Sequence, residues 1–215
     1  MKWPDDFINK VIQGDCLGVM KQMPDKCVDL VLTDPPYGIN ADKGTRGFGS
    51  SKHTVKKYKD NWDSKTPTKD YFDEMFRVGK NVIIFGGNYF TDKLPVSRGW
   101  QVWDKVGDIV FDNPYSHVEL IYTSFNKTNK KYQVIQQGFV SSEKNRFHPT
   151  QKPVVLISKL LEDFSEPDHI ILDCFAGGGS TLIAAKKLGR KFIGIEISPE
   201  YCKIAEDRLR QEVLL

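Results

Sequence analysis

The chain has 215 residues, of which 40% are hydrophobic and 27% are charged, and its formal net charge at pH 7 is only +3. This length suffices for one sizeable hydrophobic core rather than two, so we expect a single domain over residues 1–215. The four cysteines lack metal-ligand spacing, no signal peptide opens the chain, and no run of about 18 apolar residues could cross a bilayer, which predicts a cytoplasmic protein that binds no metal and no membrane.

Predicted strands and helices alternate along most of the chain. Short runs rich in β-branched residues and leucine predict strands, and longer runs with apolar residues at helical spacing predict helices. In chain order these are strand 10–15, helix 16–27, strand 28–34, helix 68–79, strands 81–87, 100–105 and 118–125, helix 154–164, strand 169–175, helix 180–189, strand 191–197 and helix 199–215. Such alternation is typical of an α/β fold with a mostly parallel sheet and helices on both faces, in which 100–105 and 118–125 read as an antiparallel strand pair.

The charge is distributed unevenly. Residues 43–69 hold eight Lys or Arg against two Asp or Glu, residues 126–152 hold six against one, and the rest of the chain is acidic. Both segments contain Gly, Ser, Thr or Asn, as loops do. We interpret them as loops that bind a polyanion, with solvated surface lysines as the alternative.

A glycine-rich turn, DCFAGGGST at 173–181, joins a predicted strand to a predicted helix. Gly177 and Gly179 expose backbone N–H groups where a ligand can approach without meeting a Cβ. The dinucleotide fingerprint is not met, because Leu182 stands where its third glycine belongs, and a plain NAD site is disfavoured. Glu196 ends the next strand, where an acid can accept both hydroxyls of a ribose. The alternative is a tight turn with an incidental acid.

The segment TDPPYG at 33–38 follows another predicted strand. Its prolines fix φ and remove two N–H donors, so we expect their carbonyls to face outward. Asp34 and the Pro35 carbonyl then form a rigid pair of acceptors beside the ring of Tyr37. Two acceptors and a stacking face suit a planar group that carries an NH2. Asp15 ends a third strand, although Asp after Gly is common wherever a strand stops.

D-P-P-Y at 34–37 together with F-x-G-x-G at 175–179 is the signature pair of the S-adenosylmethionine-dependent amino-methyltransferases of DNA, and the chain resembles that family. D-P-P-Y comes first, which looks like the permuted order of the family's β group. HPTQKP at 148–153 is similar to the family's segment against the methionine end of the cofactor. Further similarity to short phage, prophage and bacterial members lies in WDK at 103–105, ELIYTSF at 119–125 and the segment 189–209.

The resemblance implies a Rossmann-like sheet in circularly permuted methyltransferase order, with S-adenosyl-L-methionine as cofactor. It implies site-specific methyl transfer to an amine of double-stranded DNA, as in bacterial or phage restriction-modification. We expect N6 of adenine, because related cytosine enzymes usually place serine where Asp34 stands. N4 of cytosine is the alternative; RNA and protein glutamine are disfavoured because such relatives usually resemble the unpermuted order.

The resemblance also assigns residue roles. Asp34, Pro35, Pro36 and Tyr37 form the catalytic loop, with Tyr37 as a stacking platform for a base flipped out of the duplex. The cofactor's adenine amine would face Asp15, its ribose Glu196, and its methionine carboxylate Thr150 and Lys152. Further cofactor contacts are expected from Cys16, Asp34, Asp173, Phe175, Gly177, Gly179 and Ser180.

Two features depart from the family pattern. Cys174 replaces the usual proline and Gly178 the commoner serine of the glycine block. More consequentially, larger relatives carry a separate target-recognition region, for which the chain offers only basic insertions at about 40–69 and 106–147. We therefore expect these insertions to recognise a short DNA site, or a homodimer to complete the surface.

Overall fold

The computed structural model describes residues 1–39, 63–108, 116–137, 140–141 and 151–211. Its strands are β1 Lys10–Gln13, β2 Val28–Thr33, β3 Gly79–Phe85, β4 Gly99–Asp104, β5 Val118–Thr123, β6 Lys131–Gln133, β7 Gln136–Gln137, β8 Val140–Ser141, β9 Ile170–Asp173 and β10 Lys191–Glu196. Its helices are α1 Cys16–Met20, α2 Lys69–Val78, the 3-10 turn η2 Gly87–Tyr89, α3 Val154–Phe164, α4 Ser180–Lys187 and α5 Pro199–Gln211. No helix within these ranges is long and apolar enough to span a membrane.

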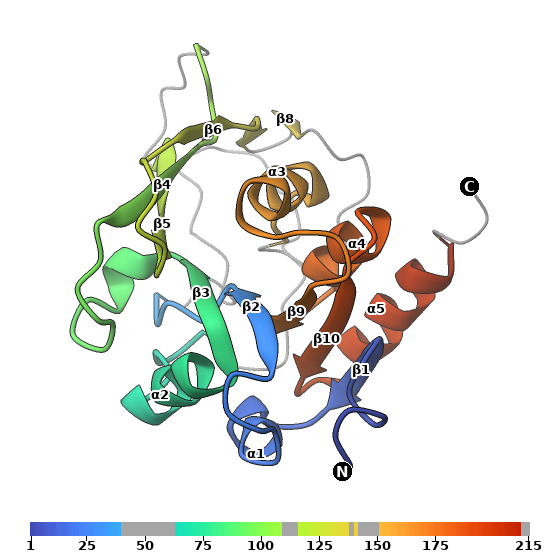
Figure 1. Cartoon of the computed structure of the whole chain (residues 1–215). Coiled ribbons are helices and arrows are strands. Elements are labelled where there is room, and N and C mark those ends of the chain that lie inside the picture. Colours follow the sequence, from blue (N-terminus) through green and yellow to red (C-terminus); the bar gives the residue numbers. More distant parts are fainter. Residues whose placement is uncertain (40–62, 109–115, 138–139, 142–150, 212–215) are drawn as a thin grey trace.

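Eight strands form one sheet in the order β1-β10-β9-β2-β3-β5-β4-β6 (Figure 1). The first five strands in this order run parallel to one another, whereas β5 is antiparallel to both β3 and β4. The mostly parallel sheet and its antiparallel strand pair are therefore confirmed. The sheet places β9 and β10, from the C-terminal part of the chain, between β1 and β2. The permuted order relative to other methyltransferases stays a prediction.

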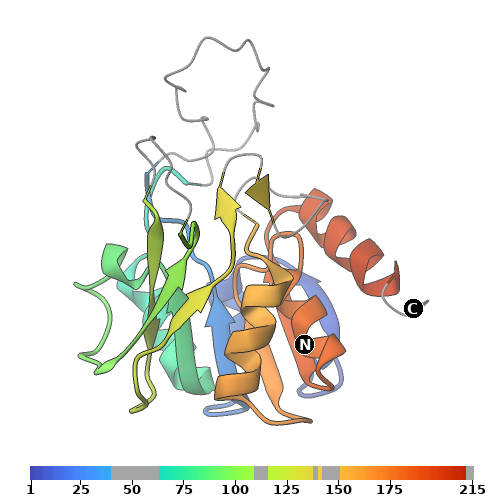
Figure 2. The ribbon, with the colours of Figure 1, turned by 90° about the horizontal axis from the view of Figure 1, so that it is seen from above.

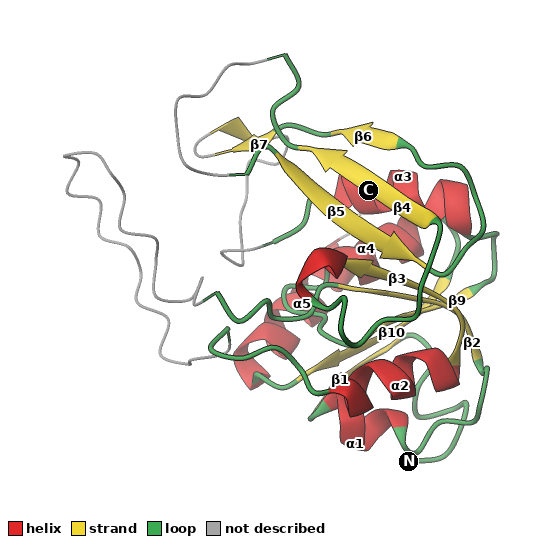
Figure 3. Ribbon diagram, turned by 90° about the vertical axis from the view of Figure 1, so that its left-hand side faces the viewer, coloured by secondary structure: helices red, strands yellow, loops and turns green. Residues whose placement is uncertain are grey.

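Helices cover both faces of the sheet, as predicted. Figure 2 shows α3 and α4 side by side, and Figure 3 shows α1 and α2 on the opposite side of the sheet. Each face has its own hydrophobic core: one contains buried side chains of α3, α4 and α5, the other those of α1 and α2. Strand β2 serves both cores, because Leu30 and Leu32 point into the first and Val28 and Val31 into the second. This two-sided burial explains its continuous apolar sequence.

The helix predicted at 16–27 is wrong in length, since α1 ends at Met20. The Arg77 guanidinium of α2 donates to the carbonyls of Met20 at 2.7 Å and Met23 at 2.9 Å. These bonds satisfy carbonyls that a longer helix would have used, and Pro24 disfavours helical backbone at the residue before it. A tertiary contact from 54 residues away thus shortens the helix.

The predicted insertions lie partly outside the described residues. The range at about 40–69 is described only from residue 63, and Thr150 is likewise outside. The range at about 106–147 is not an insertion throughout, because β5 and β6 within it belong to the main sheet. Strand β6, which pairs in parallel with β4, was not predicted; its three residues, KYQ, carry too little apolar pattern to identify a strand.

Gly194 of β10 is expected to be intolerant of a side chain, because a Cβ there would lie 2.4 Å from Leu182 Cδ1 of α4 and 3.3 Å from Ala176 Cβ. We predict that Gly194→Ala lowers the free energy of unfolding in urea by about 1–3 kcal/mol, since the buried helix must shift. The matched control is Gly18→Ala on exposed α1, where a Cβ would meet no atom within 4 Å. Equal stability of both variants would contradict this close approach.

Candidate functional site

A cavity of about 320 Å³ lies beyond the carboxyl ends of β1, β9 and β10. Four predicted cofactor residues line it, namely Asp15, Cys16, Phe175 and Glu196. Pro36, predicted as catalytic, lines it as well. Further lining residues were not predicted from the sequence: Gly14, Lys65, Thr66, Pro67, Thr68, Tyr71, Cys174, Ile195 and Ile197. The volume and mixed polar and apolar wall are those of a small-molecule site.

Glu196 fixes the glycine turn at the edge of this cavity. Its Oε2 accepts the Gly177 N–H at 2.8 Å, and its Oε1 accepts the Ser198 N–H at 2.8 Å. Burial raises the pKa of Glu196, against these N–H bonds, which lower it. The turn needs glycine at Gly177 and Gly179, whose φ values of +48° and +78° are left-handed, and a Cβ on Gly179 would lie 2.8 Å from Ala205 Cβ.

Tyr71 of α2 completes the opposite wall. Its hydroxyl donates to Asp15 Oδ1 at 2.9 Å, and its ring stacks with Phe175 at 6.3 Å between centroids. Burial and the Asp15 carboxylate raise the pKa of Tyr71 to about 12, so it remains a donor at neutral pH. The sequence offered only a helical aromatic here, which core packing would explain equally well. Tyr71 therefore became a site residue only through the fold.

Asp173, predicted to border the cofactor, does not line the cavity. It is buried at 4% exposure, where Oδ1 accepts the Thr33 hydroxyl at 2.7 Å and the Phe175 N–H at 3.1 Å. Burial raises the pKa of Asp173 to about 6, although hydrogen bonds from Thr181, Thr33 and Phe175 lower it. Asp173 thus holds the ends of β2 and β9 together from inside.

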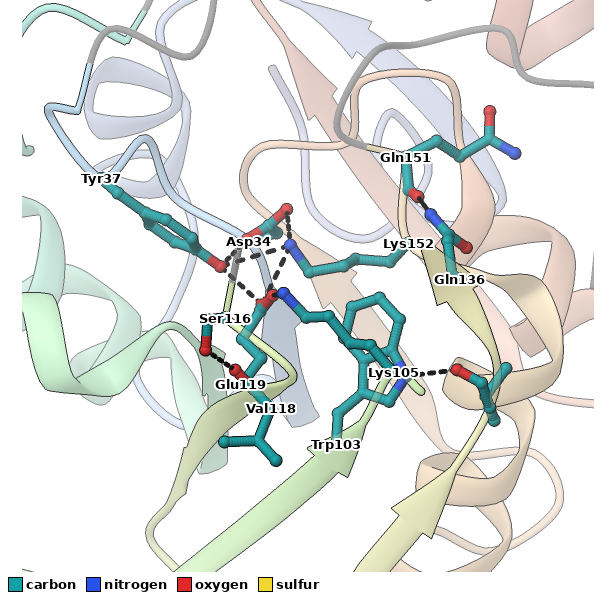
Figure 4. A network of polar contacts seen from close by, with 11 residues as sticks. Asp34, Tyr37, Trp103, Lys105, Ser116, Val118, Glu119, Gln136, Gln151 and Lys152 are labelled. Atoms are coloured by element: carbon teal, nitrogen blue, oxygen red, sulfur yellow. Dashed lines mark hydrogen bonds and ion pairs between the residues drawn. The ribbon is translucent and has the colours of Figure 1, made fainter. Parts of the chain in front are cut away.

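A second polar cluster lies at the end of β2 (Figure 4). Asp34 accepts the Tyr37 hydroxyl on Oδ1 at 2.6 Å and the Lys152 ammonium on Oδ2 at 2.6 Å. Glu119 of β5 faces the same two donors, with Oε1 at 2.8 Å from the Tyr37 hydroxyl and 3.1 Å from Lys152 Nζ. Its Oε2 pairs with Lys105 Nζ at 2.8 Å. Two carboxylates and two ammonium groups thus meet around one phenol.

The cluster is buried enough to shift its ionisation. Burial raises the pKa of Asp34, which Lys152 opposes and Glu119 reinforces. Burial would also raise the pKa of Glu119, but Lys152 and Lys105 outweigh it and hold that pKa at about 2. Burial lowers the pKa of Lys152, yet both carboxylates raise it above its ordinary value. Glu119 and Lys152 are therefore a permanent ion pair at neutral pH, and Tyr37, whose pKa is also raised, keeps its proton.

The role predicted for Lys152 needs correction. Its side chain is 8% exposed and its ammonium is neutralised by Asp34 and Glu119 of its own chain, so its charge is not left for a ligand's carboxylate. Tyr37 also has a contact the sequence did not predict, because its ring stacks on the 43% exposed Tyr89 at 4.7 Å and 11°. Ser180 is buried at the start of α4, and its Oγ has no hydrogen-bond partner among the described residues.

Glu119 and Lys105 were not predicted as site residues. Both lie in segments whose family resemblance was noted, WDK and ELIYTSF, without a role. Along β5, Glu119 points into the cluster, whereas Val118 and Leu120 are 43% and 37% exposed. An acid that alternates with two outward apolar residues reverses the usual pattern of a sheet, and it was the signal available in the sequence. In the described residues, no group of three or more His, Cys, Asp or Glu could hold a metal ion.

Comparison with known proteins gives consistent relatives. The model of the N6/N4 DNA methylase family matches residues 92–207. The methylase YubD of Escherichia coli (strain K12) is 31% identical, over 94% of this chain and 90% of its own length. The type II methyltransferase M.HinfI of Haemophilus influenzae is 28% identical, over 96% of this chain and 70% of its own.

Solved structures share the fold. The DNA modification methylase TTHA0409 of Thermus thermophilus has a TM-score of 0.62 at 22% identity, covering 95% of both chains, and has also been solved with S-adenosyl-L-methionine. The cytosine-N4-specific PvuII DNA methyltransferase has a TM-score of 0.62 at 15% identity, covering 92% of this chain and 85% of its own. At these identities the structural similarity establishes the fold and leaves the target base open.

The raised pKa of Asp173 predicts a pH-dependent stability. An unfolded Asp loses its proton near pH 4, whereas folded Asp173 keeps it to about pH 6. Between these values the folded state binds the extra proton, so stability falls as the pH rises, by roughly 1.4 kcal/mol per pH unit. We expect this slope in the difference between the wild type and Asp173→Asn, measured by urea unfolding from pH 4 to 7.

Thr33→Val provides the matched variant, because it deletes a hydrogen bond that lowers the pKa of Asp173. In this variant the fall in stability should extend to higher pH. A difference between wild type and Asp173→Asn that is independent of pH would contradict a carboxyl protonated at pH 5.

Proposed function

The chain belongs to the N6/N4 DNA methylase family, and on that premise we propose that it transfers a methyl group from S-adenosylmethionine to the N6 amine of adenine in double-stranded DNA. One observation carries the proposal: the loop after β2 contributes Pro36 to the cavity and Asp34 and Tyr37 to the polar cluster. A single rigid loop therefore borders both the small-molecule site and an acceptor for an amine.

The cavity fits the nucleoside part of the cofactor. Asp15 is exposed at the cavity and can accept from the adenine amine, while Phe175 and Tyr71 supply aromatic walls. Glu196 retains lone pairs on both oxygens after accepting two backbone N–H groups, so it can also accept ribose hydroxyls. The buried Ser180 hydroxyl at the start of α4, unpartnered within the described part of the chain, is a further polar group beside the glycine turn.

The cofactor, when bound, supplies an electrophilic methyl group on its sulfonium. An exocyclic amine is a poor nucleophile because its lone pair is delocalised into the ring. Donation of its two N–H bonds to Asp34 and the Pro35 carbonyl would favour a pyramidal nitrogen with a freed lone pair. The base must leave the duplex to reach Asp34, and stacking against the aromatic pair Tyr37 and Tyr89 would recover part of that cost. Positioning then provides most of the rate.

The choice of adenine rests on Asp34. A carboxylate accepts more strongly than the serine that related cytosine enzymes usually place there, and a purine gives the aromatic pair more surface to stack on. Site-specific action, as in restriction-modification, is part of the proposal, since a type II methyltransferase aligns over 96% of the chain. The homodimer stays a prediction.

Cofactor binding should depend on Glu196. We predict that Glu196→Gln weakens S-adenosylmethionine binding roughly tenfold to a hundredfold, because one oxygen that accepts ribose hydroxyls is replaced by an amide donor. Isothermal titration calorimetry measures the Kd directly. Glu200→Gln, on the exposed first turn of α5, is the matched control and should bind as the wild type does. Wild-type affinity in Glu196→Gln would exclude Glu196 from the cofactor site.

The product identifies the target base. We expect the purified protein, incubated with S-adenosylmethionine and duplex DNA, to produce N6-methyladenine, measured by mass spectrometry after digestion to nucleosides. Asp34→Asn should lower the rate at saturating substrates roughly a hundredfold or more, because an acceptor aimed at the reacting amine is lost. Cofactor affinity should remain near that of the wild type.

Asp92→Asn, which changes an exposed carboxylate outside the cluster, controls for charge removal. N4-methylcytosine as the sole product would refute the adenine assignment and leave methyl transfer intact. A fully active Asp34→Asn would remove Asp34 from the mechanism altogether.

A further inference from the structure

Both oxygens of Asp34 are already occupied by the protein itself. Tyr37 donates to Oδ1 and Lys152 to Oδ2, each at 2.6 Å (Figure 4). If Asp34 accepts the target amine, as proposed above, the amine must displace or share one of these donors. A neutral amine competes poorly with a buried ammonium, because charge-assisted hydrogen bonds are roughly twice as strong as neutral ones. The site therefore needs a second acceptor to hold the displaced donor.

Glu119 is placed to be that acceptor. Its Oε1 lies 3.1 Å from Lys152 Nζ and 2.8 Å from the Tyr37 hydroxyl, so it faces the same two donors as Asp34. The Tyr37 hydroxyl has one proton and can donate to only one of the two carboxylates at a time. The Lys152 ammonium has three protons and can bridge both. Each donor can thus shift from Asp34 to Glu119 with little movement.

Glu119 is itself held in place from the far side. Lys105 pairs with Oε2 at 2.8 Å, and its ammonium also lies 5.0 Å from the centre of the Trp103 ring. Trp103 is fixed in turn, because its Nε1–H donates to the Val134 carbonyl at 2.8 Å. Glu119 is only 10% exposed, so it is neither solvated nor free to rotate away. The Trp and Lys of the WDK segment thereby acquire a role, which is to anchor this carboxylate.

We propose that Glu119 is a positioning residue for methyl transfer, which takes over Lys152 and Tyr37 when Asp34 engages the target amine. Charge balance supports this assignment. Asp34 and Glu119 neutralise Lys152 and Lys105, so the cluster carries no net charge. Without the Glu119 charge, both ammonium groups would be drawn to Asp34 alone. The amine would then meet an acceptor more firmly held by the protein's own cations.

The test uses single-turnover methylation of duplex DNA at saturating S-adenosylmethionine. Glu119→Gln should lower the rate roughly tenfold or more while the Kd values for cofactor and DNA stay near those of the wild type. Glu119→Gln/Lys152→Met should be faster than Glu119→Gln, because the competing cation is gone and neutrality is restored. A residue that merely supports the fold would show the opposite, with the double variant slower than either single one.

Controls separate this inference from the proposed function. Glu162→Gln, on the exposed face of α3, should behave as the wild type. If Glu119→Gln is poorly folded, Glu119→Asp keeps the charge with a shorter reach and should retain a rate between those of wild type and Glu119→Gln. A wild-type rate for Glu119→Gln beside an inactive Asp34→Asn would overturn this inference alone, as would a double variant slower than Glu119→Gln. A fully active Asp34→Asn would instead overturn the proposed function.

Discussion

The pairing of β2 with β9 is the contact on which the whole site depends. Leu30 and Val31 pair with Ile171 and Leu172, and the Thr33 hydroxyl donates to Asp173 at 2.7 Å across a sequence separation of 140 residues. Because parallel strands end at the same edge, this pairing brings the TDPPYG loop and the glycine turn together. Neither segment could form a site alone, since one offers acceptors for an amine and the other a cavity for a nucleoside.

The sheet and its chemically loaded strand ends could be predicted because their signals are local. Buried parallel strands are continuous apolar runs, and glycines mark turns that no side chain could occupy. What could not be predicted is tertiary in origin. Arg77 ends α1 by taking its carbonyls, and Tyr71 reaches Asp15 only because α2 packs beside α1. Lys152 was assigned to a ligand because the sequence contains no sign that two carboxylates surround it.

The polar cluster is costly to build and is thus informative. Moving charges out of water costs several kcal/mol per ion, and removing one partner of a buried pair typically costs about 3–5 kcal/mol. Apolar residues of similar size would pack at no such cost. Asp34 and Glu119 are nonetheless retained side by side with one shared ammonium, which raises the pKa of Asp34 through both burial and like charge. A fold selected only for stability would not require this arrangement, whereas an exchange of donors at Asp34 does.

The two prolines connect this cluster to the cavity. Pro35 and Pro36 fix the backbone between Asp34, which faces the cluster, and Pro36, which lines the cavity. Transfer between an amine and a methyl donor requires their reacting atoms to be held about 3–3.5 Å apart, and errors of about 1 Å are costly in rate. A flexible linker would let that separation vary with each turnover. The prolines therefore do more than expose a carbonyl: they set the distance between the two halves of the reaction, and Glu119 lets the acceptor half open without moving the backbone that sets it.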